Sequence, residues 1–288
     1  MFEITSRETL SPNGIHKIIV RAPLVAAKAR AGEFVVIMIS EFGERIPLTI
    51  VDANPSEGTI TLIFQEAGKT TKELATLKQG DKLSDVLGPL GNPTEIKDYG
   101  RVITVAGGVG VAEVYPVSRA LKNAGNRVVS VIGARSKDLI ILEKEMRAVA
   151  DQLYVATDDG SYGIKGNVGD VLKDLIVSIR PDMVYAIGPV PMMRAVSDIT
   201  KVYGIKTIVS LNPIMVDGTG MCGACRIKVG GRTRFSCVEG PEFDAHLVDW
   251  DELLMRLRIF NKEEKRALDH YCHLMNLKTS RESKKELE

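Results

Sequence analysis

The sequence predicts a β-barrel that precedes an α/β domain with a parallel sheet, followed by a small cysteine loop and a helical tail. Three observations predict this order. Short β-rich runs fill the first third of the chain, apolar strands then alternate with helical runs, and three of the four cysteines crowd together near the C-terminus. With 288 residues, the chain is long enough for about two domains and smaller additions. The units that we expect are residues 1–97, 98–212, 213–242 and 243–288.

Residues 1–97 predict β-strands because runs of β-branched and apolar residues alternate with turn residues. The turn-rich stretch Asn54–Gly58 lies between two of these runs, Ile46–Val51 and Thr59–Gln65, so we expect them to pair as a hairpin. Further strands are expected at Ile15–Ala22, Glu33–Ser40 and Lys82–Leu87. Several short strands at this spacing are typical of a barrel or a sandwich.

Residues 98–212 predict an α/β domain of the nucleotide-binding type, because the strands are apolar throughout and therefore covered on both faces. The expected strands are Arg101–Ala106, Val128–Gly133, Leu153–Thr157, Met183–Ile187 and Ile205–Leu211. The expected helices are a run that ends at Leu121, then Leu142–Ala150, Val168–Ile176 and Met192–Lys201.

A glycine-rich turn, Gly107–Ala112, joins the first of these strands to its helix. Glycines let the backbone turn tightly and approach a phosphate, and a helix N-terminus supplies unpaired N–H groups. The spacing differs from the usual G-x-G-x-x-G, and a tight turn that binds nothing remains an alternative. Glu113 follows directly, and we expect it to point elsewhere because a carboxylate is unfavourable beside a pyrophosphate.

The clustered cysteines predict an iron–sulfur site. Cys222, Cys225 and Cys237 are spaced x2 and x11, and thiolates are soft ligands for zinc or iron–sulfur clusters. With Asp217 the register becomes x4, x2, that of a plant-type [2Fe–2S] loop with Asp in the first position. We favour Asp217 as the fourth ligand over Cys272, which is expected on a helix as a packed thiol. A zinc site with His246 or His273 is a further alternative.

The overall charge excludes some functions. Lys and Arg number 38 and Asp and Glu 37, so the net charge of +1 leaves no basic excess for nucleic acid. No stretch approaches the ~20 apolar residues of a membrane-spanning helix. The N-terminus lacks a signal pattern and the cysteines are clustered, so we expect a cytoplasmic protein without a membrane or nucleic-acid partner.

The C-terminal residues predict two amphipathic helices, over Leu247–Leu257 and Glu263–Leu274. Their apolar face suits packing on this chain or on a partner subunit. The polar segment Lys278–Glu288 is expected to fray.

Taken in order, these motifs resemble the ferredoxin–NADP reductase superfamily, and within it the electron-transfer subunits of the dihydroorotate dehydrogenase type. The resemblance covers about residues 1–242 and includes Gly88-Pro89-Leu90-Gly91 at the end of the barrel. It implies FAD on the barrel. The implied FAD-binding residues are Arg45, Pro47, Leu48 and Thr49, followed by Gly68, Lys69, Thr70 and Thr71. Arg45 as a surface charge is the plain alternative.

The resemblance also implies NAD(H) on the α/β domain. The residues that it assigns are Gly107, Gly108, Val109, Gly110 and Ala112, then Arg135, Asp158, Asp159, Gly188 and Pro189. Asp158 and Asp159 also fit plain turn chemistry, and Arg135 fits a solvated face. We favour NADH over NADPH.

The implied chemistry is cofactor-borne: hydride passes between nicotinamide and flavin, and single electrons pass to a [2Fe–2S] cluster. No catalytic side chain is therefore expected. The cluster ligands would be Asp217, Cys222, Cys225 and Cys237.

Two residues, Asp217 and Glu113, depart from the superfamily pattern. With these departures, the sequence most resembles the small subunits of electron-bifurcating NADH-dependent reduced ferredoxin:NADP oxidoreductases. That implies a hetero-oligomer with a larger flavin and [4Fe–4S] subunit, linked indirectly to ferredoxin and NADP(H). The alternatives are an electron-transfer subunit of dihydroorotate dehydrogenase, sulfide dehydrogenase or a hydrogenase, and a non-catalytic zinc module on a nucleotide-sensing domain.

Overall fold

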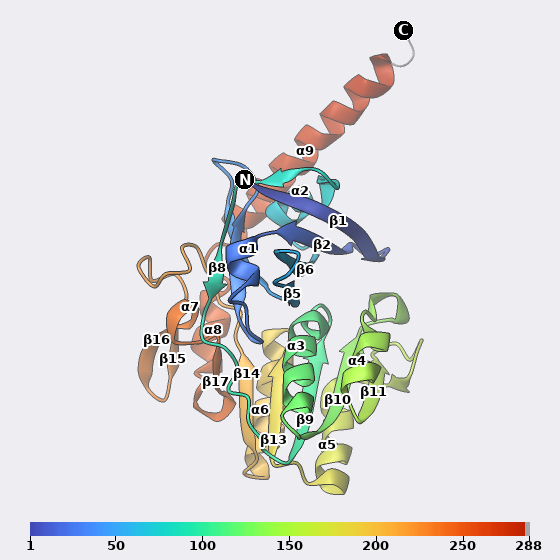
Figure 1. The fold of residues 1–288 in the computed structure, drawn as a ribbon, viewed down its shortest axis with the longest axis vertical. Helices are drawn as coiled ribbons and strands as arrows, with labels where there is room; N and C mark the ends of the chain where they lie inside the picture. Colours follow the sequence, from blue (N-terminus) through green and yellow to red (C-terminus); the bar gives the residue numbers. More distant parts are fainter. Residues whose placement is uncertain (286–288) are drawn as a thin grey trace.

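A β unit and an α/β unit stack one above the other, with a small cysteine-containing unit beside them and a long C-terminal helix that projects outward (Figure 1). The computed structural model describes residues 1–285. No described helix combines the length and the apolar character that crossing a membrane requires.

The β unit consists of two sheets with the strand orders β5-β6-β2-β1-β7 and β4-β3-β8. Its strands are β1 (Phe2–Ser11), β2 (Ile15–Arg21), β3 (Phe34–Met38), β4 (Arg45–Thr49), β5 (Asp52–Asn54), β6 (Thr59–Gln65), β7 (Lys82–Leu83) and β8 (Asp85–Leu90). Two short helices, α1 (Pro23–Ala26) and α2 (Lys69–Thr76), accompany them. Inward-facing residues such as Ile18, Val35 and Leu62 are buried between the sheets, as the period of two along each strand requires.

The predicted hairpin of Ile46–Val51 with Thr59–Gln65 is wrong in its pairing. β4 pairs with β3, and only the short β5 pairs with β6. The chain changes sheets between β4 and β5, where the consecutive residues Ile50 and Val51 are both buried and interrupt the alternation. The predicted strand Lys82–Leu87 is likewise divided at Ser84 between β7 and β8. In the described chain, two sheets linked at these corners therefore take the place of a closed barrel.

The α/β unit has a sheet of order β12-β11-β10-β9-β13-β14-β17, parallel except for its last strand. Its elements are β9 (Arg101–Gly107), α3 (Gly110–Asn123), β10 (Arg127–Ala134), η1 (Lys137–Leu139), α4 (Glu143–Val149), β11 (Gln152–Thr157), β12 (Ile164–Lys165), α5 (Val168–Ile179), β13 (Met183–Ile187), α6 (Val190–Val202) and β14 (Lys206–Ser210). Every strand and helix predicted in this region is present.

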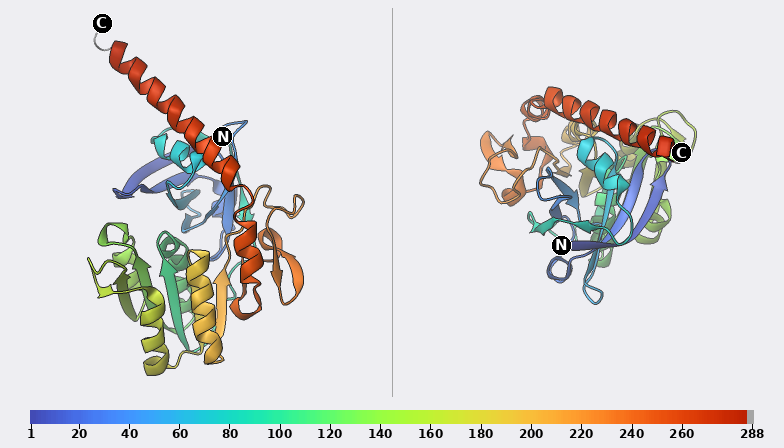
Figure 2. Two further views of the ribbon diagram at one scale, coloured as in Figure 1. Left: turned by 180° about the vertical axis from the view of Figure 1, so that it is seen from behind. Right: turned by 90° about the horizontal axis from the view of Figure 1, so that it is seen from above.

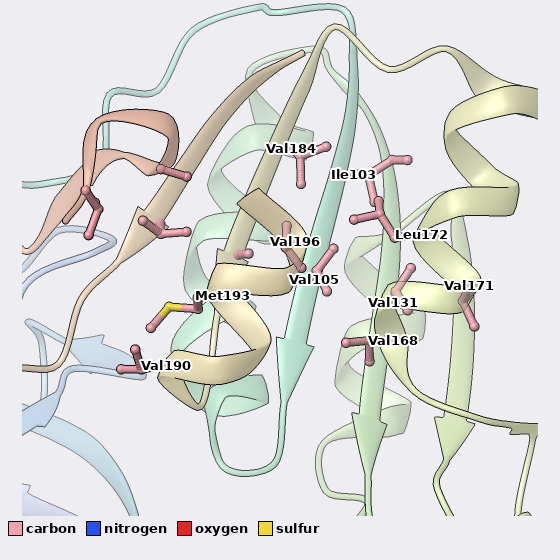
Figure 3. Close-up of a cluster of buried hydrophobic side chains, with 14 of the residues drawn as sticks. Ile103, Val105, Val131, Val168, Val171, Leu172, Val184, Val190, Met193 and Val196 are labelled. Atoms are coloured by element: carbon pink, nitrogen blue, oxygen red, sulfur yellow. The ribbon is translucent and has the colours of Figure 1, made fainter. Parts of the chain in front are cut away.

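Two apolar layers hold this sheet. α5 and α6 cover one face, where Val168, Leu172 and Met193 pack on Val105 and Val131 of the central strands (Figure 3). α3 and α4 cover the other face through residues such as Val114, Val117 and Met146. Both faces are buried, which explains the uninterrupted apolar strands in the sequence.

The C-terminal part contains the hairpin β15 (Arg226–Val229) and β16 (Arg232–Phe235), α7 (Ser236–Glu239), β17 (Glu242–Asp244), η2 (Ala245–Leu247), α8 (Trp250–Arg256) and α9 (Asn261–Lys285). β17 adds an antiparallel edge to the α/β sheet beside β14, which the sequence analysis missed. α8 packs on this chain, because Trp250 and Leu253 belong to the α/β core.

Helix α9 crosses α2 and extends beyond the β unit (Figure 2). The predicted fraying from Lys278 is wrong as far as Lys285, because the helix continues to that residue. The remaining three residues of that prediction lie outside the described part of the chain.

Candidate functional site

A cavity of about 470 Å³ lies at the carboxyl ends of the parallel strands, the edge where open α/β sheets bind ligands. Eight residues assigned to NAD(H) line it together: Gly107, Gly108, Val109, Gly110, Arg135, Asp158, Gly188 and Pro189. Ile15 and Gln65 of the β unit complete the wall, so the cavity lies at the junction of the two units. The structure thus brings together residues that are 80 positions apart in the sequence.

The glycine turn lets the backbone of α3 come close to β13 and to the cavity. Gly108 has a φ of 59°, in the left-handed region that favours glycine. A Cβ on Gly110 would lie 2.8 Å from the Ile187 carbonyl oxygen, so only glycine lets α3 begin this close to β13. The N-terminus of α3 therefore opens directly onto the cavity.

Glu113 departs from expectation, because it lines the cavity rather than pointing elsewhere. The N-terminal turn of α3 directs this side chain along the cavity wall, three residues after Gly110. Glu113 is half-buried in this wall, and desolvation raises its pKa to about 7.

Two of the assigned residues do not border the cavity. Ala112 is buried in the core beneath α3. Asp159 Oδ1 accepts hydrogen bonds from Ser161 N at 2.9 Å and Ser161 Oγ at 2.6 Å, which also lower the pKa of Asp159. Asp159 therefore shapes the turn after β11, whereas Asp158 faces the cavity.

Ser210 and Asn212 also line the cavity, although the sequence analysis did not assign them a role. They lie at the carboxyl end of β14, and the position of binding sites in parallel sheets is the signal that would have found them. From Asn212 the chain leads directly into the cysteine loop.

The two segments assigned to FAD lie side by side. The Thr70 hydroxyl, in the first turn of α2, donates a hydrogen bond to the Glu44 carboxylate, next to the start of β4. Arg45 Nη1 lies 3.1 Å from Asp85 Oδ2 of β8, so the Arg45 guanidinium is paired as well as half-exposed. The start of β4 and the N-terminus of α2 thus form one polar surface.

Within β4 the side chains alternate. Ile46 and Leu48 pack against the core of the β unit, so the backbone of Leu48 is the part that can face a ligand. Pro47 and Thr49 are half-buried on the opposite face. In α2, Thr71 Oγ1 accepts hydrogen bonds from Ala67 N at 2.9 Å and Gly68 N at 3.0 Å, and nothing lies within 4 Å of a Cβ placed on Gly68. Half-exposed Lys69 follows, and its ammonium beside this open turn suits a dinucleotide phosphate.

The cysteine loop (residues 217–225) places Cys225 next to Cys237, so two of the three thiols assigned to the cluster are in contact. Cys225 and Cys237 are buried with their Sγ atoms 3.2 Å apart. Burial raises the pKa of the Cys237 thiol to about 12, with a further contribution from Cys225 and a smaller one from the Asp217 charge. Asp217 and both buried thiols therefore interact with one another.

Asp217 is held toward Cys222 by the loop backbone. Its Oδ1 accepts from Thr219 N at 2.8 Å and its Oδ2 from Cys222 N at 2.7 Å. The N–H of Thr219, followed by that of Cys222, lowers the pKa of Asp217, so the carboxylate is ionised. Gly218, Gly220 and Gly223 have φ values of 74°, 84° and 69°, which allow this tight winding. Three thiols and an anionic oxygen donor fit an iron–sulfur cluster.

The alternative ligands lie elsewhere. Cys272 lies on a helix, α9, as expected, but the expectation of a packed thiol is wrong because this residue is exposed. Its neighbour Tyr271 has a pKa raised mainly by burial and further by Glu73 of α2. His246 Nε2 lies 3.0 Å from Thr200 Oγ1 of α6. Among the described residues, no group of three or more His, Cys, Asp or Glu side chains is arranged around a single metal ion, and this holds for the four residues assigned to the cluster as well.

The cysteine loop packs directly against the strand that faces β4. A Cβ on Gly218 would lie 3.0 Å from Val36 Cγ2 and 2.6 Å from Leu90 Cδ1. Val36 is also the residue of β3 that pairs with Pro47 of β4. Phe34, Val36 and Met215 form one apolar cluster with Cys225 and Cys237. The loop is therefore one strand away from the backbone assigned to the flavin.

Comparisons with known proteins match two regions of this chain to family models. Residues 212–249 match the family model described as the iron-sulfur cluster binding domain of dihydroorotate dehydrogenase B, and residues 104–198 match the oxidoreductase NAD-binding domain. The dihydroorotate dehydrogenase B (NAD(+)) electron transfer subunit homolog of Thermotoga maritima is 49% identical over 264 residues, which cover 92% of each chain.

Two further proteins are similar over most of the chain. The dihydroorotate dehydrogenase B (NAD(+)) electron transfer subunit of Geobacillus thermodenitrificans is 36% identical and covers 80% of this chain and 91% of its own. The second is a chain from the structure of an NADH-dependent reduced ferredoxin-NADP oxidoreductase, an enzyme studied for flavin-based electron bifurcation. It is 45% identical to this chain. It matches with a TM-score of 0.89 over 94% of this chain and 98% of its own.

The fold and the sites together define a ferredoxin reductase-like oxidoreductase that uses FAD, an iron–sulfur cluster and NAD(H). The chain belongs to the dihydroorotate dehydrogenase B electron-transfer subunit family. Electron-transfer subunits of this family imply a larger catalytic partner. The match to an iron–sulfur cluster binding domain excludes the alternative function as a non-catalytic zinc module.

Proposed function

We propose that this chain is the NADH-oxidising electron-transfer subunit of an electron-bifurcating NADH-dependent reduced ferredoxin:NADP oxidoreductase. The observation that carries the proposal is the likeness to that enzyme, 45% identical with a TM-score of 0.89 over nearly the full length of both chains. The flavin supplies the conversion between hydride transfer and one-electron transfer. The chain itself binds the dinucleotide, orients it and holds the cluster next to the flavin.

The arrangement of the sites supports this order of transfer. The dinucleotide cavity reaches Ser210 and Asn212, from which the chain continues into the cysteine loop. That loop contacts Val36, the residue opposite Pro47 on the flavin strand. We assign Asp217, Cys222, Cys225 and Cys237 as the ligands of a [2Fe–2S] cluster. Exposed Cys222 and Met221 place one side of this loop at the surface, where electrons can leave toward the partner.

The test is to purify the chain with its natural partner and determine the cofactors and reactions of the complex. We expect FAD and [2Fe–2S] on this chain, flavin and [4Fe–4S] on the larger one, and NADH oxidation that requires both NADP and reduced ferredoxin. Complex that oxidises NADH with neither of these would contradict the proposal.

A role as the electron-transfer subunit of a dihydroorotate dehydrogenase is the second candidate, and the 36% identity to such a subunit favours it. The same purified complex distinguishes the two. NAD-dependent oxidation of dihydroorotate by an FMN-containing partner would support the second candidate and exclude the first. The matched control is the complex after the partner subunit has been exchanged for the dihydroorotate-oxidising subunit of a relative.

A further inference from the structure

Glu113 is a half-buried acid in the wall of the dinucleotide cavity, and it has no role in the proposed function. It lines the dinucleotide cavity, and among the described residues no side chain or backbone group pairs with its carboxyl. Desolvation is the sole cause of its shifted pKa, so no neighbouring cation compensates its charge. Burying an unpaired carboxylate is costly, and a ligand that supplies a positive charge would remove that cost.

The location of Glu113 within the cavity identifies the part of the ligand that it meets. The Glu113 charge contributes to the raised pKa of Tyr185 in β13, whereas Arg135 and Asp158 at the β10 and β11 end do not influence Glu113. Gly110, one turn before Glu113 on α3, approaches the Ile187 carbonyl and Gly188 at the end of β13, so Glu113 lies at the β13 end of the cavity. Ser210 and Asn212 continue the wall from the end of β14 toward the cysteine loop. Hydride transfer requires the nicotinamide to lie at that end.

We propose that the Glu113 carboxylate contacts the nicotinamide end of the dinucleotide and makes the cavity discriminate NAD⁺ from NADH by charge. This inference rests on the proposed function. The oxidised ring carries one positive charge and the reduced ring none, while both share the same adenosine and pyrophosphate. Binding of the oxidised form is therefore written as Glu113–COOH + NAD⁺ giving Glu113–COO⁻·NAD⁺ + H⁺, in which charge and atoms balance.

The sign of the pH dependence follows from the pKa of about 7. A ligand that prefers the ionised carboxyl gains affinity as the pH rises toward that value and gains no more above it. The reduced dinucleotide, which lacks the positive charge, does not show this gain. The preference for NAD⁺ over the reduced form therefore increases between about pH 6 and pH 8.

Other ionisable groups near Glu113 do not produce the same signal. Tyr185 of β13 is fully buried, with its hydroxyl bound to Glu242 of β17, and its pKa is raised well above the ordinary value. Glu143 and Arg147 of α4 pair with each other at 2.6 Å. Of the remaining charged groups around α3, His16 pairs with Glu66 in the β unit and Arg119 pairs with Asp52. Arg135 and Asp158 line the cavity at its β10 and β11 end. Those at the far end meet the part common to both ligands.

The test compares NAD⁺ with 1,4,5,6-tetrahydro-NAD, an inert dinucleotide with an uncharged ring, on the oxidised holo-complex. Dissociation constants are measured at several values from pH 6 to pH 8.5. In the native protein, the affinity for NAD⁺ relative to the analogue rises roughly five- to tenfold over this range. Glu113→Gln reduces the rise to less than about twofold. Glu145→Gln, on the exposed face of α4, is the matched control and retains the native rise.

A second measurement needs no variant. Calorimetry of NAD⁺ binding in buffers of different ionisation enthalpy reports the protons released, and we expect release near pH 6.5 with NAD⁺ but not with the analogue. An equal pH dependence in Glu113→Gln and native protein, or no proton release by native protein, would overturn the inference. Native complex that binds neither dinucleotide overturns the proposed function as well, whereas tight binding of both with equal pH dependence overturns the role of Glu113 alone.

Discussion

The backbone of the cysteine loop fixes the orientation and the charge of the Asp217 side chain. Both of its oxygens accept backbone N–H groups of the cysteine loop, and this holds the carboxylate beside Cys222. The exposed Cys272 on α9 belongs to a different part of the surface, alongside α2. The two candidates for the fourth cluster ligand therefore give opposite mutational results.

We expect Asp217→Ala to perturb the [2Fe–2S] absorption and electron paramagnetic resonance spectra and to lower the iron content, because one iron loses an anionic ligand. Cys272→Ser serves as the control and keeps both spectra. Asp217→Cys retains a cluster with a shifted potential, because thiolate replaces carboxylate. A native spectrum in Asp217→Ala together with loss of the cluster in Cys272→Ser would assign the ligand to Cys272 instead.

Individual residues also show where prediction from sequence succeeds. The glycine turn, Arg135 and Asp158 line one cavity because each follows a parallel strand, and such strands end at the same sheet edge. Their assignment to NAD(H) stays a prediction from the motif resemblance. Glu113 was placed wrongly because its environment depends on the depth of the cavity, which arises from contacts between β unit and α/β unit. No local pattern encodes that depth.

Among the elements, α3 depends most on a single residue. Gly110 allows its first turn to approach β13, where a Cβ would lie 2.8 Å from the Ile187 carbonyl and 3.1 Å from Gly188 Cα. Both contacts are with backbone atoms, which cannot rotate away.

We therefore expect Gly110→Ala to displace the start of α3 and to weaken dinucleotide binding by roughly tenfold or more, a cost of about 1–3 kcal/mol. Equilibrium binding of NAD⁺ to the oxidised protein measures this effect, and the flavin and cluster spectra should remain native. Gly204→Ala, at the end of α6, is a matched control. Its φ of 62° strains alanine, but nothing lies within 4 Å of the new Cβ, so affinity should not change. Equal losses of affinity in both variants would contradict this explanation.

The pairing error in the β unit has a physical cause at the level of elements. Asn54–Gly58 does form a turn, but only the three residues of β5 lead into it, since Ile50 and Val51 carry the chain from one sheet to the other. Both sheets bury apolar residues in one shared core, so the sequence pattern of β4 is the same whichever sheet it joins. β17 was missed for a related reason: three residues carry too little periodicity to be recognised as a strand.

In the whole molecule, a buried polar network joins three parts of the chain. The Glu242 carboxylate of β17 accepts hydrogen bonds from the Thr94 hydroxyl, in the segment after β8, and from the Tyr185 hydroxyl of β13. Gly32 of the β unit lies against the same network, where a Cβ would come within 2.8 Å of Glu242 Oε1. The Glu242 carboxylate thus links the segment after β8 to strands β13 and β17 of the α/β sheet.

We expect Glu242→Ala to destabilise the protein by about 2–4 kcal/mol, because two buried hydroxyl donors lose their acceptor. Urea unfolding followed by circular dichroism measures the change. Glu242→Gln retains an acceptor oxygen and should cost less than Glu242→Ala. An alanine variant as stable as the glutamine variant would show that the hydroxyls find other partners.

The pH dependence of this network has a defined sign. Burial raises the pKa of Glu242 above its ordinary value of 4.5. The folded state therefore favours the protonated acid, and its contribution to stability is complete below pH 4.5 and declines as the pH rises through the folded-state pKa. We expect the difference in unfolding free energy between native protein and Glu242→Gln to follow that decline, and a pH-independent difference would contradict it.

The pairing of β17 with β14 holds the two ends of the segment that contains the cysteines close together. Ser210 of β14 lies opposite Glu242 of β17 in the ladder, so the chain leaves the sheet and returns to it at neighbouring positions. Segments whose two ends are held close together exchange with little change in closure entropy. The stretch between these two residues is therefore a loop inserted at one edge of the sheet, and changes in its length alter the closure entropy only slowly.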